Sequence, residues 1–166
     1  LNVRHDLLFA LIGGGMDRFL CRVWSGLPPV EHERRFVTGI DRIEAADVEA
    51  VAEPQDILAL RHLVAETHVA PSVTDYGMAL VEHIRRDPRS AQPLTPRASI
   101  GLHKASRALA FLSGRDYVLP DDVKYLFPFV VYHRIVLSED AEASGVTQDA
   151  IIAAALDDVP VPKEPA

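Results

Sequence analysis

The stretch LTPRASIGLHKASRALAFLSGRDYVLPDDV, residues 94–123, predicts one helix, a sharp stop and the start of a second helix. Thr95 is a suitable N-cap residue, and Pro96 suits the first helical position. Gly114 is expected to end this helix after Ser113. Pro120, followed by two aspartates, has the composition of another helix start. The face expected to point inward carries Ala98, Leu102, Ala105, Leu109 and Leu112.

The rest of the sequence also favours helices. We expect them from about Val30, over residues 54–68, over 72–87 and over 147–159. Two segments, residues 19–26 and 133–137, are strand-like, and the apolar run Leu7–Ile12 fits either a buried strand or part of a helix. We therefore predict a mainly α fold, a helical bundle with one or two short β elements.

The composition restricts the class of protein. The 166 residues suit one domain with attachments, and the formal net charge of -7 argues against a protein that mainly grips nucleic acid through phosphates. The single cysteine, Cys21, excludes an internal disulfide and is interpreted as a small apolar filler. No apolar run is long enough for a membrane span, so we expect no membrane insertion and a cytoplasmic location.

The usual motifs of a self-contained active site are missing from the sequence. The segment GGGMD, residues 13–17, has neither the lysine nor the hydroxyl residue of a phosphate-binding loop. No His-Glu-x-x-His helix and no Gly-x-Ser-x-Gly elbow occurs. The seven histidines are scattered, and even His62 and His68 would point to different faces of one helix. We predict no metal site and no independent enzyme from these residues.

Two arginines stand out as candidate functional residues. Arg97 lies in the first turn of a helix, where the free N–H groups favour an anion. It is either a phosphate-binding group or a solvated charge compensated by a nearby carboxylate. Arg18 lies beside Phe19 and Leu20, which we expect to be buried. It either reaches into a neighbouring site or forms a surface pair with Asp17.

Taken together, these segments resemble the C-terminal part of a MoxR-type AAA+ ATPase. MDRFL, residues 16–20, is similar to the end of the ATPase core in that family. Residues 95–137, with GRDYVLPDDV and HRIVL, resemble its helical lid, and the helix pair at 54–87 also fits the lid. The resemblance runs from about Met16 to Leu137.

The resemblance implies roles for both arginines. Arg97 would be the sensor 2 arginine, which with Pro96 contacts ATP bound to the core of the same subunit. Arg18 would be the arginine finger that completes the site of the adjacent subunit in an oligomeric ring. A planar guanidinium suits both roles, because phosphoryl transfer spreads negative charge over several oxygens. ATP and Mg²⁺ would be the cofactors of the full-length parent.

The family resemblance also implies partners and a function. The lid would couple ATP binding and hydrolysis to chaperone-like remodelling or maturation of client proteins. Its partners would be the ATPase core, neighbouring subunits of the ring, and a client or a von Willebrand-type protein, with no nucleic acid.

The sequence departs from the family by lacking the nucleotide-binding loop, the Walker B strand and the sensor 1 asparagine. We therefore expect residues 1–26 to be a remnant of the ATPase core or an artificial segment, residues 27–160 to be the lid domain, and 161–166 to be a loose tail. The chain alone should bind no cofactor and hydrolyse no ATP. A stand-alone helical adaptor that binds another protein is the alternative interpretation. A helix-turn-helix nucleic-acid binder is a third, opposed by the acidic balance.

Overall fold

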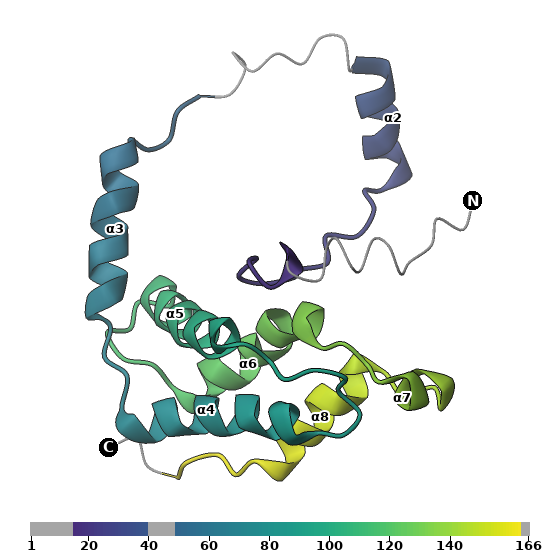
Figure 1. Ribbon diagram of the computed structural model, residues 1–166. Coiled ribbons are helices and arrows are strands. Elements are labelled where there is room, and N and C mark those ends of the chain that lie inside the picture. The colour runs from purple at the N-terminus through teal and green to yellow at the C-terminus, as the bar shows by residue number, and fades with distance from the viewer. Residues whose placement is uncertain (1–14, 40–48, 164–166) are drawn as a thin grey trace. The chain divides into compact units, whose positions relative to one another are not determined.

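The computed structural model describes residues 15–39 and 49–163, which group into two compact units. One unit is Val23–His62, and the other combines the N-terminal segment up to Arg22 with Leu63–Ala166. Figure 1 shows the helices that make up each unit. Because the candidate site lies entirely in the second unit, the first is described only briefly.

The unit Val23–His62 holds helix α2, Val30–Gly39, and most of helix α3, Pro54–Glu66. Both helices occur where the sequence predicts them, since Pro29 precedes α2 and Pro54 opens α3. Neither helix contains a buried residue. The apolar side chains of Ile57 and Leu58 are each more than half exposed.

The second unit is a helical bundle in which every helix has a recognisable start signal. Helix α4, Pro71–Arg86, α5, Pro96–Leu112, and α6, Pro120–Val131, each begin at a proline. Helix α7, Glu139–Ala143, and α8, Gln148–Asp158, are capped by the hydroxyls of Ser138 and Thr147. A short 3-10 helix, η3, Tyr132–Arg134, follows α6 directly.

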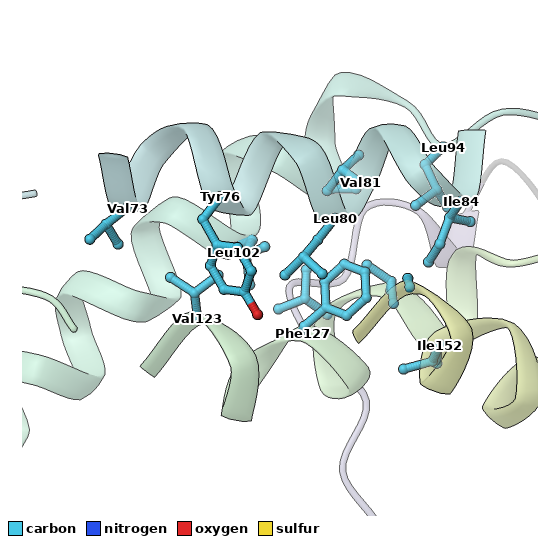
Figure 2. Packing of buried hydrophobic residues seen from close by; sticks show 14 of the residues in the cluster. Val73, Tyr76, Leu80, Val81, Ile84, Leu94, Leu102, Val123, Phe127 and Ile152 are labelled. Carbon is cyan, nitrogen blue, oxygen red and sulfur yellow. The ribbon is translucent and has the colours of Figure 1, made fainter. Parts of the chain in front are cut away.

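One apolar core lies between helices α4, α5, α6 and α8 of this unit. Figure 2 shows Leu80 and Ile84 of α4 pointing toward Phe127 of α6. All three side chains are fully buried, as is Ile151 of α8, and Leu102 of α5 is nearly so. The buried positions of α4 recur every three or four residues, which is the spacing of one helical face. The mainly helical fold predicted from the sequence is thereby confirmed.

The buried stripe of α5 differs from the predicted one. Its buried residues are Ala98, Gly101, Leu102, Ser106 and Ala110. Because the stripe advances by four residues per step after Ala98, Leu112 is rotated out of it and is 81% exposed, so its predicted inward position is wrong. Ser106 tolerates burial since its hydroxyl donates to the Leu102 carbonyl oxygen at 2.9 Å.

The predicted strands are reduced to isolated bridges within the described residues. His68 pairs with Tyr117 in parallel, and Ser90 pairs with Leu137 in antiparallel orientation. The segment at 133–137 is half helical because η3 occupies its start, and its later residues face a loop rich in proline rather than a strand. Residues 19–26 form no strand. The apolar run Leu7–Ile12 lies outside the described residues.

The turn between α5 and α6 is fixed by an ion pair. Gly114 adopts a φ of 74°, the left-handed conformation that favours glycine and ends the helix. Arg115 then donates from both terminal nitrogens to Asp122, at 2.8 and 2.6 Å. The same carboxylate accepts the backbone N–H of Leu119 at 2.8 Å and so caps α6. The hydrogen bonds to the Asp122 carboxylate raise the pKa of Arg115 above its ordinary value.

Candidate functional site

The segment Gly15–Arg22 makes a single helical turn and then lies against the end of α6. The turn is closed by the Arg18 N–H, which donates to the Gly15 carbonyl at 3.1 Å. Farther along, the Arg22 N–H donates to the Phe129 carbonyl at 2.8 Å, and the Arg22 guanidinium stacks 4.3 Å from the centre of the Tyr132 ring. The N-terminal segment thus belongs to the bundle.

Arg134 of η3 anchors this segment. Its side chain is only 3% exposed, and it donates to the backbone carbonyls of Asp17, Phe19 and Leu20 at 3.3, 2.6 and 3.2 Å. It also donates to the Val130 carbonyl one turn earlier. Burial lowers the pKa of Arg134, although the Asp17 carboxylate opposes that shift. A buried guanidinium with this many acceptors is held in one orientation.

The Asp17 carboxylate joins three parts of the bundle. It accepts the Nε hydrogen of Arg134 at 3.2 Å, the Thr95 hydroxyl at 3.0 Å and an Nη hydrogen of Arg97 at 3.3 Å. The Asp17 side chain is 16% exposed. Thr95 meanwhile caps α5, because its oxygen accepts the Arg97 N–H at 3.3 Å. The N-terminal segment, the start of α5 and η3 therefore meet at one carboxylate.

Arg97 is the accessible member of this cluster. Its side chain is 56% exposed, and among the described residues its only side-chain hydrogen bond is the one to Asp17. Pro96, its neighbour at the first position of α5, is exposed as well. One of the two alternatives for Arg97 required a nearby carboxylate, and Asp17 supplies it. More than half of the Arg97 side chain is nevertheless exposed to solvent.

Arg18 lies in a setting that differs from the expected one. Phe19 and Leu20, predicted to be buried, are 64% and 49% exposed, since at these two positions Arg134 binds the backbone carbonyls. Arg18 is itself exposed and forms no ion pair within the ranges that the structure describes. The possible partner Asp17 is bound by Arg97 and Arg134 instead.

The described residues contain no candidate metal site. No three His, Cys, Asp or Glu side chains in residues 15–39 and 49–163 are grouped so that they could hold a metal ion. In the same ranges no helix combines the length and apolarity that a membrane span requires. Cys21 is exposed, so the interpretation as a buried filler is wrong for a segment bound through its backbone.

His133 supports the anchored segment from the side. Its Nε2 lies 3.1 Å from the Phe19 carbonyl, and its buried Nδ1 finds no hydrogen-bond partner among the described residues. Burial is the largest cause of a lowered pKa for His133. Neither His133 nor Arg134 is among the functional residues predicted from the sequence, because the pattern at 133–137 indicates a strand. The only available signal was their place in the HRIVL motif.

Comparison with known proteins gives a family match for the part of the chain that contains Arg97 and Arg134. Residues 83–155, which run from the end of α4 into α8, match the AAA lid domain family. The matched residues are similar to that lid domain, and they include Arg97, Thr95 and Arg134 but not Asp17.

Over most of its length the chain is similar to MoxR proteins. It is 31% identical to Chaperone MoxR1 of Mycobacterium tuberculosis, over 97% of this chain and 45% of that protein. It is also 31% identical to the protein YeaC of Bacillus subtilis, over 96% of this chain and 50% of YeaC. A solved structure described as a "putative ATPase" from Cytophaga hutchinsonii superimposes with a TM-score of 0.78 at 26% identity, over 91% of this chain and 49% of that one.

The chain spans about half the length of the curated relatives it matches. A third relative, the protein MoxR of Paracoccus denitrificans, is 29% identical over 97% of this chain and 54% of its own length.

Proposed function

We propose that this chain is the lid portion of a MoxR-like AAA+ ATPase, with Arg97 as its sensor 2 residue. The observation that carries the proposal is the position of Arg97. It lies in the first turn of α5, inside the region that matches the AAA lid domain, and 56% of its side chain is exposed. A guanidinium beside the free N–H groups of a helix start is suited to a phosphate.

The described residues fit one part of an ATP site. They offer a cation and the exposed Pro96 for the terminal phosphates, but no cluster of acidic side chains for Mg²⁺. Bound ATP would supply the phosphoryl group, and Mg²⁺ would neutralise charge on its phosphates. In this proposal both are held mainly by an ATPase core, while Arg97 adds a positive charge and ties the orientation of α5 to the nucleotide.

We also propose that Arg18 is the arginine finger. Its exposure and its place in the turn Gly15–Arg22 leave the guanidinium accessible to a neighbouring subunit of a ring. Coupling of hydrolysis to lid movement would serve a chaperone-like role toward client proteins, together with a von Willebrand-type partner, in the cytoplasm. The name of the M. tuberculosis relative, a chaperone, supports that role.

A second candidate function is a helical adaptor that binds another protein without nucleotide. The observation that favours it is the exposed apolar surface of α3, on which Ile57, Leu58 and Leu60 are 53%, 54% and 43% exposed. An apolar helix face of this kind can enter the groove of a partner. Under this alternative, Arg97 and Asp17 would form only a structural ion pair.

The experiment that separates the two uses a longer protein in which this chain is joined to its ATPase core. Arg97→Ala should lower ATP turnover at least about tenfold, on the order of 1.4 kcal/mol at the transition state, and leave the melting temperature nearly unchanged. Arg86→Ala is the matched control, because Arg86 is an exposed arginine at the C-terminal end of α4 and pairs with Glu82 of the same helix. Equal turnover in the two variants would remove Arg97 from the nucleotide site and favour the adaptor.

A further inference from the structure

The two arginines that share Asp17 are held very differently. Arg134 is 3% exposed and is fixed by backbone carbonyls in addition to the carboxylate. Arg97 is 56% exposed and contacts the carboxylate through one hydrogen bond of 3.3 Å. If Arg97 moved away, Asp17 would still be paired with Arg134 and would still accept the Thr95 hydroxyl. Departure of Arg97 therefore leaves no buried charge without a partner, which is the costly part of breaking such a cluster.

We propose that Asp17 and Arg134 are positioning residues, and that Asp17 is the anion that Arg97 exchanges for a phosphate. Arg134 fixes Asp17 at the start of α5, and Asp17 holds Arg97 until a phosphate competes for it. The inference rests on the proposed function, since it takes Arg97 to be a phosphate-binding residue.

The exchange links the phosphate contact to the N-terminal segment. Asp17, which pairs with Arg97, precedes Arg18 in the sequence and belongs to the segment Gly15–Arg22. Leu20 also contacts α5 closely, because a Cβ built on Gly101 would lie 3.3 Å from its Cδ1 atom. A phosphate that takes Arg97 removes one of the bonds between this segment and α5. Binding of a phosphate to Arg97 is thereby coupled to the attachment of the N-terminal segment to α5.

A competing carboxylate predicts a specific effect on anion affinity. Asp17→Asn keeps the shape of the side chain and removes its charge, so Arg97 no longer has an anion to leave. We expect tripolyphosphate, used as the probe on the full 166-residue chain, to bind roughly three- to fivefold more tightly to this variant, which is the upper part of the range for an exposed ion pair. Isothermal titration calorimetry at low salt measures the affinity, and circular dichroism verifies that the fold is kept.

The general effect of losing a negative charge is controlled in two ways. Glu82→Gln removes the same charge from a carboxylate that pairs with Arg85 and Arg86 rather than with Arg97, and it should change the affinity much less. In a chain that already carries Arg97→Ala, Asp17→Asn should give no gain. Equal gains from Asp17→Asn and Glu82→Gln, a gain that persists without Arg97, or no measurable binding to the Asp17→Asn chain would each overturn the proposal.

The positioning role of Arg134 is tested through Cys21, the only cysteine of the chain. A nitroxide on Cys21 reports the mobility of the anchored segment by electron paramagnetic resonance. Arg134→Met should make the label more mobile, and the exposed control Arg86→Ala should not. If Arg134→Met unfolds the bundle, Arg134→Lys keeps a charge but loses the multiple donors, and it should also mobilise the label. An unchanged spectrum in the folded variant would contradict the anchoring role.

These outcomes can be told apart from failure of the proposed function. If Arg97→Ala lowers ATP turnover while Asp17→Asn leaves the tripolyphosphate affinity unchanged, the sensor role stands and the exchange is wrong. If Arg97→Ala leaves turnover unchanged, the proposed function itself fails.

Discussion

Removal of the Asp122 carboxylate should be one of the most costly single changes to the bundle. The side chain of Asp122 is 8% exposed and accepts three hydrogen bonds, two from Arg115 and one from the Leu119 backbone. Arg115 is 22% exposed, so its pair with the carboxylate is only partly screened by water. We assign about 2 kcal/mol to the charged pair and about 1 kcal/mol to the cap, which gives roughly 3 kcal/mol for Asp122→Ala.

The assay is urea unfolding followed by circular dichroism, applied to a double-mutant cycle. Asp122→Ala, Arg115→Met and the double variant should give a coupling energy of about 2 kcal/mol, because each single change removes the same pair. Asp121→Ala is the matched control. Asp121 has the same charge in the same helical turn but is exposed, and its loss should cost about 0.5 kcal/mol through the helix dipole.

Two results would refute this reasoning. Asp122→Ala could cost no more than Asp121→Ala, or the coupling energy between Arg115 and Asp122 could fall below about 0.5 kcal/mol. Either result would mean that the turn between α5 and α6 is held by Gly114 and apolar packing alone, without a contribution from the ion pair.

Two further predictions concern the core and the pH dependence of stability. Phe127→Ala should cost about 3–5 kcal/mol of unfolding free energy, because Phe127 is fully buried between the helices, and an unfolding midpoint unchanged in urea would contradict its place in the core. Burial lowers the pKa of His133 and also that of His103, so the folded chain favours their neutral forms while the unfolded chain takes up protons near its ordinary pKa of about 6.5. The stabilising effect of the two neutral histidines should therefore be fully present above that pH and be lost as the pH falls through the lowered pKa values. In urea titrations, His133→Gln should make the loss of stability between about pH 7.5 and 5.5 smaller. An equal loss in the variant and the unchanged chain would exclude His133 as a source of the pH dependence.

The helices could be predicted from the sequence because their signals are local. Thr95 with Pro96, Pro120 with its aspartates, and Thr147 each supply the cap or the first turn of a helix by themselves. These signals depend on neighbouring residues and not on the rest of the fold, so the structure places α5, α6 and α8 where the sequence predicts them.

The cluster around Asp17 could not be predicted in the same way. Arg134 lies in a strand-like segment, where a charged residue is expected to face solvent. Its burial depends on carbonyl groups of a segment more than a hundred residues earlier in the chain. The predicted strand at 133–137 and the expected burial of Phe19 and Leu20 were wrong for the same reason. In both cases a long-range contact to the backbone overrides the local pattern.

The anchor formed by Arg134 recognises main-chain atoms, and this affects how the N-terminal segment can vary. At Phe19 and Leu20 the contacts with Arg134 go to carbonyl oxygens, which every amino acid has. The hydrogen bonds from Arg134 can therefore persist when the side chains at these positions change, while Asp17 is the one position where Arg134 also binds a side chain. Hydrogen bonding to Arg134 thus constrains the residue type at Asp17 alone, and Phe19 and Leu20 can differ without loss of those bonds.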